Sequence, residues 1–342
     1  VQIPASSIID ICIAGNTVMS YLLLGWDTRL LEQPTTDISR NPVIVKAESL
    51  LIESGPGAYV YLLPAVSRFV GGDAVGDVIV SSIPSSQEIV LVIDLGTNGE
   101  IILGNADWLA SVSCASGPAF EGAGISSGMR AMKGAIDHVT IDPVSCQVTC
   151  TTILDMPPLG ICGSGIIDAA AAMVNAGILD FTGKLVETKP GVRPGSDGFE
   201  FVLVSREKTG TGRDICITSQ DMLYLMDSKA AVCGAIGVLL KKYRVSVHDV
   251  RRVYLAGAFG AFSDMKNIVA FGIIPDFREA RVQGIGNGSL AGAMACLLSQ
   301  EMRRKAHETS RHMVYIDLLI DADFIEEYTA ALHIPGKKEY FS

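Results

Sequence analysis

The chain has 342 residues, of which 49% are hydrophobic and 19% charged, and it carries a formal net charge of −10. This length and apolar content predict about two packed domains. An acidic chain without clustered Lys and Arg lacks the surface that nucleic acid needs, so nucleic acid is excluded as an expected partner. The most apolar helical stretch, 230–240, is flanked by lysines and is shorter than the roughly 18 residues of a membrane span, so no membrane association is expected.

Eight cysteines are scattered singly along the chain, mostly within apolar runs. Buried, unpaired thiols are typical of a reducing compartment, and we therefore expect a cytoplasmic protein. Only Cys146 and Cys150 lie close together, and their spacing fits neither a CxxC metal knuckle nor a ferredoxin-type cysteine run.

Strand-like and helix-like runs alternate along the chain, which favours an α/β architecture. Residues 8–14 predict a strand that leads through Gly15-Asn16-Thr17 into a short helix ending at Leu24. Residues 26–64 contain scattered Pro, Thr and Gly and predict irregular connections. The polar segment SSIPSSQ at 81–87 has no periodicity, so we place the domain boundary there, giving domains of residues 1–85 and 86–342.

The second predicted domain begins with two β-rich runs, 89–94 and 100–103, joined by Gly-Thr-Asn-Gly. This is a hairpin signature, because Asn-Gly readily adopts positive φ. A long buried helix is expected from a cap at Thr218 or Ser219 to Tyr243, after a Gly/Pro-rich loop at 191–198. The other predicted elements are strands at 135–141, 147–154, 253–256 and 313–319, and helices at 160–176, 264–271, 287–298 and after Asp321.

The hairpin turn has residues suited to a nucleotide phosphate. Gly96 allows backbone N–H groups to approach phosphate oxygens, and Thr97 and Asn98 add side-chain donors. Asp94 and Glu100 are able to hold Mg²⁺ through water. Taken alone, however, the same residues are better interpreted as an ordinary type I′ hairpin with a polar turn.

A second candidate phosphate contact lies at the start of the helix near residue 163. Free N–H groups of Gly163, Ser164 and Gly165 would meet an anion at the positive end of the helix. Tight packing that requires small residues explains these glycines equally well. Asp168, one turn into the helix, is a candidate metal ligand, although an acid there also stabilises any helix.

Two further glycine segments follow. After the strand at 253–256, Gly257 and Gly260 lack side chains and permit a flat base to lie against the backbone, as an adenosine site requires. A simple strand-to-helix turn is the alternative interpretation. The segment GNGSLAGA at 286–293 begins a helix of small residues, for which close helix packing is the favoured interpretation and a hinge the alternative.

Each of these motifs is weak, but their order is specific. An Asp-Gly-Thr hairpin, a glycine helix start, a strand-glycine loop and a small-residue helix resemble the parts of one lobe of the sugar kinase, actin and heat-shock chaperone superfamily. The resemblance implies an α/β, actin-like ATPase (ASKHA) fold, with RNase H-like lobes whose mixed sheets are covered by helices.

The chain resembles one family more closely: the ATP-dependent reductive activators of corrinoid-dependent enzymes. The matching segments are GNTVMSYLLLG (15–25), VGGDAVGD (70–77), IDLGTNGE (93–100), SGPAFEGAGISSGMRAMKGAID (116–137), GICGSGIID (160–168), LAGAFG (255–260) and GNGSLAGA (286–293). Segment 116–137 is the most specific, because general ATPases of the superfamily do not share it. The chain departs from the family at Ser20-Tyr21, Ser127 and Ala261, where His, Cys and Asn are usual, and these departures leave the exact partner open.

The resemblance implies a function and a missing part. Full-length members join a ferredoxin-like domain, here expected to hold a 2Fe-2S cluster, to the ATPase fold. Such a protein uses ATP and Mg²⁺ to return an inactive Co(II) corrinoid protein of a methyltransferase system to Co(I). Because the superfamily uses two Asp-Gly-Thr hairpins and this sequence has one, we expect a fragment that lacks the iron–sulfur domain and the start of the first lobe.

The resemblance also assigns roles to the candidate residues. Asp94 and Glu100 are expected to hold magnesium or position water as the catalytic acids, and the glycine segments to bind ATP. Glu121 is a candidate additional acid of the cleft, and a solvated loop carboxylate is an equally good interpretation of it. Two alternatives stay open: a small-molecule kinase of the same superfamily, and a docking fragment that binds the corrinoid protein without hydrolysing ATP. The sequence leaves the oligomeric state open, with a homodimer as one candidate.

Overall fold

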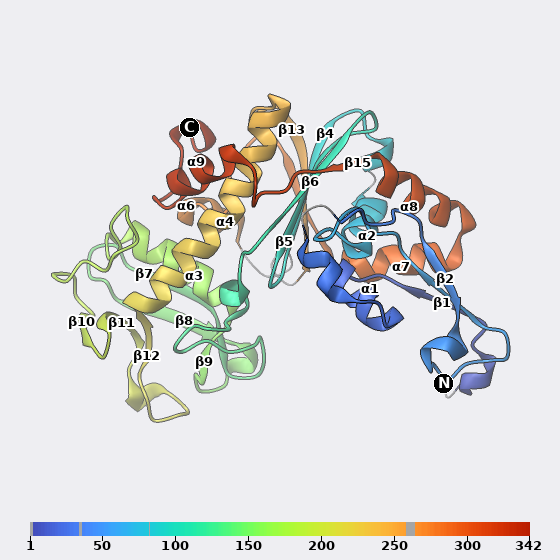
Figure 1. Cartoon of the computed structure of the whole chain (residues 1–342). Coiled ribbons are helices and arrows are strands. Elements are labelled where there is room, and N and C mark those ends of the chain that lie inside the picture. The colour runs from blue at the N-terminus through green and yellow to red at the C-terminus, as the bar shows by residue number, and fades with distance from the viewer. Residues whose placement is uncertain (1–2, 34–35, 82, 258–263) are drawn as a thin grey trace.

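A computed structural model describes residues 3–33, 36–81, 83–257 and 264–342 (Figure 1). Its centre is a six-stranded mixed sheet in which β4, β5 and β6 form an antiparallel meander. β13 runs parallel to β4, β14 parallel to β13, and β15 parallel to β6. In sheet order the strands are β14 (Arg281–Gly286), β13 (Val250–Ala256), β4 (Ile89–Leu95), β5 (Gly99–Gly104), β6 (Leu109–Cys114) and β15 (Met313–Tyr315).

Both faces of this sheet are covered, as Figure 1 shows. Successive side chains of a strand point to opposite faces, so Leu91 and Ile93 pack toward α4 (Ser219–Tyr243), whereas Val90 and Val92 pack toward α2 (Gly72–Ser81). α7 (Gly288–Leu298) and α8 (Gln300–His312) share the second core with α2. The predicted mixed sheet covered by helices is therefore present.

The long helix α4 begins with a capping box between Thr218 and Asp221, as the expected cap at Thr218 requires. Among the described residues, α4 is the one helix with the length and apolar composition to cross a membrane. However, 83% of its most apolar window is buried inside the protein, which is the environment of a core helix.

Two small sheets lie beside the long helix. In the first, β7 (Ala135–Ile141) pairs with β8 (Val148–Thr152) and β9 (Gly160–Ile161), and α3 (Gly163–Asn175) packs on it. The second contains β10 (Val192–Gly195), β11 (Gly198–Val204) and β12 (Ile215–Thr218). The prediction of a loop at 191–198 was wrong, because the glycines and Pro194 of this segment form an edge strand and its turn.

The N-terminal region forms a third small sheet, with strand order β1 (Asp10–Ile13), β3 (Tyr59–Leu62) and β2 (Val43–Lys46). Its helix α1 (Thr17–Leu24) has Asn16 as its N-cap. The prediction of irregular connections at 26–64 was wrong, since this range contains β2 and β3. Strands of four residues contain too few alternations for the period of a strand to be recognised.

The remaining elements are short. The last helices are α6 (Met265–Phe271) and α9 (Ala322–Ala331). The 3-10 turns are η1 (Ala5–Ser7), η2 (Thr28–Glu32), η3 (Ala47–Leu50), η4 (Ile83–Ser85), η5 (Pro118–Glu121), η6 (Ile153–Asp155), η7 (Arg206–Lys208) and η8 (Lys338–Tyr340). The predicted domain boundary falls at the end of η4 and stays a prediction; residues on both sides of it, such as Val75 and Val92, share one apolar core.

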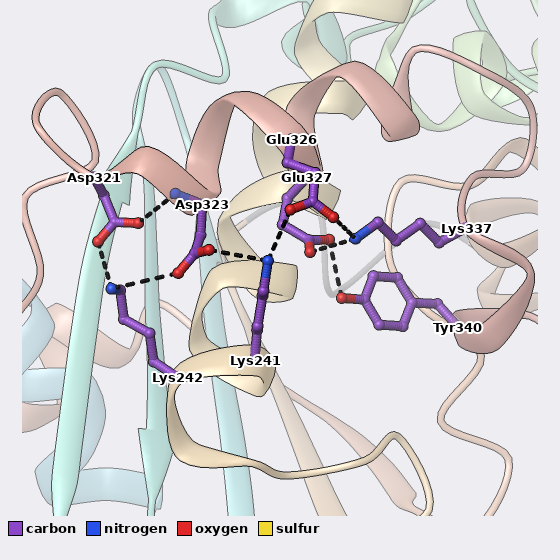
Figure 2. Close-up of polar contacts among 8 residues, drawn as sticks. All are labelled: Lys241, Lys242, Asp321, Asp323, Glu326, Glu327, Lys337 and Tyr340. Carbon is purple, nitrogen blue, oxygen red and sulfur yellow. Dashed lines mark hydrogen bonds and ion pairs between the residues drawn. The ribbon is translucent and has the colours of Figure 1, made fainter.

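Ion pairs join the two ends of the chain. The buried Arg68 guanidinium lies 2.6 Å from Asp317, and Arg303 of α8 lies 2.6 Å from Asp10 of β1. At the C-terminus, α9 is attached to the end of α4 by the contacts drawn in Figure 2, among them Lys242 to Asp321 at 2.7 Å and Lys241 to Glu326 at 2.8 Å. The N-terminal region and the C-terminal tail are thus both fixed to the central layers.

Candidate nucleotide site

The predicted phosphate hairpin is present with a three-residue turn, Gly96 to Asn98, because Leu95 pairs with Gly99. The type I′ turn was wrong, because Gly99 belongs to β5 and neither Asn98 nor Gly99 has a positive φ. Two contacts hold the turn in place. Ser116 Oγ donates to the Gly96 carbonyl at 3.1 Å, and Gly117 N–H donates to the Thr97 carbonyl at 3.0 Å. Thr97 and Asn98 are exposed and so remain accessible to a ligand.

Four carboxyl groups meet beside this hairpin. Asp94 and Glu100 are opposite each other in the β4–β5 register and therefore lie on the same face. Asp73 and Asp77 come from α2, four residues apart on one side of the helix, and α2 packs against β4 and β5. We call Asp73, Asp77, Asp94 and Glu100 the acidic cluster.

Burial and mutual repulsion favour the neutral forms of these acids. Burial, with the negative charge of Asp94, raises the pKa of Asp77 to about 9. Burial and the charges of Asp73 and Asp94 raise the pKa of Glu100 to about 8. The pKa of Asp73 is raised to about 6, and that of Asp94 is also raised, in both cases mainly by burial. A bound cation would relieve this repulsion.

The cluster fits a magnesium–nucleotide complex. Asp77 is fully buried, and as a carboxylate it finds no hydrogen-bond donor among the described residues, whereas in its neutral form it shares a proton with Asp94. Within the described ranges no group of three or more His, Cys, Asp or Glu side chains is arranged to hold a metal ion by itself. Mg²⁺ typically uses one or two carboxylates, waters and substrate phosphates, so this donor set suits Mg²⁺ that arrives with a nucleotide.

Two glycines of the predicted series directly contact the acidic cluster. Gly257 directly follows β13 with φ +73°, and a Cβ there would lie 3.0 Å from Asp94 Oδ1. A Cβ on Gly288, at the start of α7, would lie only 2.2 Å from Asp77 Oδ1. The positive φ therefore favours glycine at 257, and the buried Asp77 carboxylate leaves no room for a side chain at 288. Gly260, the other predicted adenosine residue, lies outside the described residues.

The glycine helix start is also adjacent to the hairpin. A Cβ on Gly163 would lie 1.9 Å from the Phe120 carbonyl of η5, and the Glu121 carboxylate in turn lies 3.6 Å from the Cβ position of Gly96. A Cβ on Gly165 would lie 2.5 Å from the Ile136 carbonyl, and Ser164 Oγ donates to the Asp137 carbonyl at 2.9 Å.

These contacts support the packing interpretation of Gly163 and Gly165. The N-cap of α3, Cys162, makes no side-chain capping bond. A phosphate contact of Gly163, Ser164 and Gly165 therefore stays a prediction.

Asp168 lies on α3 with both carboxylate oxygens hydrogen-bonded. Oδ2 is 3.0 Å from His138 Nδ1, and Oδ1 is 2.7 Å from Asn267 Nδ2. The structure places it in this network, and its predicted role as a metal ligand stays a prediction.

Asp73 and Asp77 were not predicted as site residues, although their segment VGGDAVGD is one of those that carry the family resemblance. The sequence does contain a signal that these two acids are buried. Most of α2 is apolar and buried, and two acids four residues apart on such a helix cannot both lie on a solvated face.

The comparisons with known proteins agree on one family. A family model described as the C-terminal domain of RACo, the ASKHA domain, matches residues 88–342, and one described as the RACo middle region matches residues 1–86. The corrinoid activation enzyme RamQ of Eubacterium limosum is 31% identical over 325 residues, which cover 92% of this chain and 54% of that protein.

Two other proteins are similar. The [Co(II) methylated amine-specific corrinoid protein] reductase of Methanosarcina barkeri is 29% identical over 69% of this chain and 44% of its own length. The solved structure of a reductive activator for corrinoid,iron-sulfur protein superimposes with a TM-score of 0.88 at 38% identity, covering 98% of this chain and 54% of that one. The chain thus spans about half the length of the proteins it matches.

Proposed function

This chain belongs to the RACo family, as its ASKHA domain preceded by its middle region, and from that premise we propose that it is the nucleotide-binding part of a corrinoid activator. The predicted family and the predicted ASKHA fold are both confirmed. In the proposed reaction, the whole protein transfers one electron to the Co(II) form of a corrinoid protein and so regenerates Co(I). The electron would come from an iron–sulfur domain outside this chain.

The observation that carries the proposal is the acidic cluster next to the glycine turn. Asp94 and Glu100 are positioned to hold the magnesium of a bound ATP, while the Gly96–Asn98 turn receives its phosphates. Asp73 is partly exposed at the start of α2, and its raised pKa suits a group that accepts a proton from an attacking water.

The same arrangement would allow ATP hydrolysis to be coupled to electron transfer. α2 lies in the part matched by the middle-region model, whereas the hairpin lies in the part matched by the ASKHA model. A nucleotide that contacts both would change their relative placement when it is hydrolysed, and a binding energy that differs between two states shifts their populations. ATP turnover would in this way assist the electron transfer.

The test uses the full-length protein and candidate corrinoid proteins. We expect an ATP-dependent loss of Co(II) absorbance that Asp94→Asn abolishes and Asp197→Asn, an exposed control in the β10–β11 turn, leaves unchanged. No ATP dependence with any corrinoid protein would contradict the proposal. A methyltransferase system as the setting of that partner, a homodimeric state and a cytoplasmic location also remain proposals, the last because all eight cysteines are free.

A further inference from the structure

Three largely exposed loops meet beside the small sheet of β7, β8 and β9. We call them together the three-loop face, which consists of residues 130–134, 153–159 and 206–213. Backbone hydrogen bonds join the loops: Gly134 N–H donates to the Ile153 carbonyl at 3.1 Å, and Gly210 N–H donates to the Pro158 carbonyl at 2.8 Å. The three segments are separated in sequence but therefore form one surface.

Large apolar side chains of the three-loop face are exposed to solvent. Met132 is 57% and Leu154 73% exposed, and Met156 and Leu159 are exposed as well. The backbone of Leu154 has φ +63°, in the left-handed region that is unfavourable for a leucine. Thr152 Oγ1 donates to the Met156 carbonyl at 2.6 Å across this turn and helps to hold it. Exposed apolar side chains that gather on one surface are typical of protein contact sites.

Positive charges accompany these apolar side chains. The face carries five Lys and Arg residues against two acids, although the whole chain has a net charge of −10. Among the described residues, one of the five, Arg206, has an ion-pair partner, the neighbouring Glu207. The other four are exposed and make no ion pair in the part of the chain that the structure describes: Arg130, Lys133, Lys208 and Arg213. Met and Arg are enriched in protein interfaces, and unpaired cations favour a partner with an acidic surface.

A second copy of this chain does not suit the three-loop face. In a two-fold symmetric dimer the same patch contacts itself, so unpaired cations would meet unpaired cations. A head-to-tail contact between the face and an acidic region elsewhere on the chain leads to an open assembly unless a ring closes. The face therefore fits a different protein, whose contacting surface is acidic and partly apolar.

The chain reaches the three-loop face directly from the phosphate turn. Gly117 N–H donates to the Thr97 carbonyl at 3.0 Å, and η5 follows at once. A Cβ on Gly122, the residue after η5, would lie 2.6 Å from the carbonyl oxygen of Met129, which directly precedes the face. Close backbone contacts thus link the turn that would receive phosphate to this surface. The connection lies within segment 116–137, which general ATPases of the superfamily do not share.

We propose that the three-loop face is the docking surface for the corrinoid protein that receives the electron, which binds there with an acidic, partly apolar surface. The inference rests on the proposed function, from which it takes the partner, and it adds the place of contact. A segment that other ATPases lack serves what the family does besides hydrolysing ATP, and here it forms part of the face. Its link to the phosphate turn allows the nucleotide and the corrinoid protein to influence each other's binding.

The experiment measures the ATP-dependent loss of Co(II) absorbance by the full-length protein over a range of concentrations of the corrinoid protein that it reduces. Leu154→Asp should raise the KM for the corrinoid protein about tenfold or more, while kcat and the Kd of Mg·ATP change less than about twofold. Lys133→Glu should raise this KM most at low salt, because salt screens the pairing of exposed charges. Val144→Asp, at a 90% exposed position in the β7–β8 turn of the same sheet, is the matched control and should leave the KM unchanged.

Three kinetic outcomes would overturn the inference. They are an unchanged KM in both Leu154→Asp and Lys133→Glu, an equal rise of KM in Val144→Asp, and a loss of Mg·ATP affinity as large as the rise in KM. Two further results would assign the face to another occupant: a dimer that Leu154→Asp dissociates in sedimentation, or binding to phosphatidylglycerol vesicles that Leu154→Asp abolishes.

Folding of the variants and failure of the proposed function are tested separately. Thermal denaturation shows whether Leu154→Asp is folded, and if it is not, Lys133→Glu still tests the inference because it replaces one exposed charged side chain by another. If the unmodified protein reduces no corrinoid protein, the proposed function itself fails. If it is active and both variants match it, the docking inference alone fails.

Discussion

Asp77 and Gly288 are in contact where α2 packs against α7, and a Cβ at residue 288 would lie 2.2 Å from Asp77 Oδ1. Gly292 and Gly76 meet in the same way one turn further along, with a Cβ at 292 only 2.3 Å from the Gly76 Cα. The N-terminus of α7 carries partial positive charge, so its approach to a buried carboxylate is favourable. The small residues of the 286–293 segment therefore have a packing role that bears directly on the acidic cluster.

Gly288→Ala should disturb both packing and nucleotide binding. The added methyl group must displace either the Asp77 carboxylate or α7, and overpacking of this kind costs about 1–3 kcal/mol of unfolding free energy. We expect a lower melting temperature and weaker Mg·ATP binding, measured by thermal denaturation and calorimetry. Ser289→Ala, the neighbouring residue in α7, is the control. An unchanged ATP affinity in Gly288→Ala would show that the contact does not influence the site.

Asp77→Asn should stabilise the ligand-free protein in a pH-dependent way. The folded state holds a proton on Asp77 up to about pH 9, whereas the unfolded chain releases it near the ordinary Asp value of 3.8. Between these values the unfolded state binds fewer protons, so the free energy of unfolding falls as pH rises. Asn removes this dependence.

The gain should be small near pH 4 and reach about 1–3 kcal/mol at pH 8.5. Urea denaturation at pH 5 and pH 8.5, with Asp197→Asn as the control, measures it. A variant that is less stable than the unmodified protein at pH 8.5 would show that the Asp77 carboxylate is not disfavoured by its surroundings.

Binding of Mg·ATP should release protons. At pH 7 the folded, ligand-free protein holds protons on Asp77 and Glu100, whose pKa values are raised to about 9 and about 8 mainly by burial. Mg²⁺ favours the carboxylate forms, so binding expels protons and its affinity rises with pH between about 6 and 8. Titrations in buffers with different ionisation enthalpies measure the number released. Glu100→Gln should release fewer protons, and identical heats in all buffers would contradict the expectation.

The site was predictable from sequence where local geometry dictates the residue. The Asp94–Glu100 hairpin consists of a tight turn between two β-rich runs, and Gly257 has a positive φ. Both features can be predicted from a few neighbouring residues of the sequence. The glycines at 163 and 165 were visible too. Whether these glycines serve packing or phosphate binding could not be predicted, because close packing against the Phe120 carbonyl and the approach of an anion both require glycine.

The rest depended on contacts that a local pattern does not contain. β3 pairs with β1 across about fifty residues, with Leu62 opposite Ile13, and four-residue strands show no clear period. The place of Asp77 in the site could be recognised only from the structure, in which Gly288, more than two hundred residues later, lies against it. Similarly, the surroundings of Asp168 depend on a hydrogen bond from Asn267, a residue that no motif singled out.

Two adjacent glutamates of α9 should differ sharply in their effect on stability. Both contact Lys337, as Figure 2 shows, but the Glu327 side chain is 1% exposed and also accepts from Tyr340 at 2.9 Å, whereas that of Glu326 is 60% exposed. Glu327→Ala leaves the buried Tyr340 hydroxyl without its acceptor and leaves Lys337 with only the exposed Glu326 as a partner, so we expect a loss of about 3 kcal/mol. Glu326→Ala, the matched control, should cost about 1 kcal/mol or less, because exposed ion pairs are weak. Urea denaturation of both variants measures the difference, and equal losses would show that the buried contacts of Glu327 with Lys337 and Tyr340 stabilise the protein no more than an exposed ion pair does.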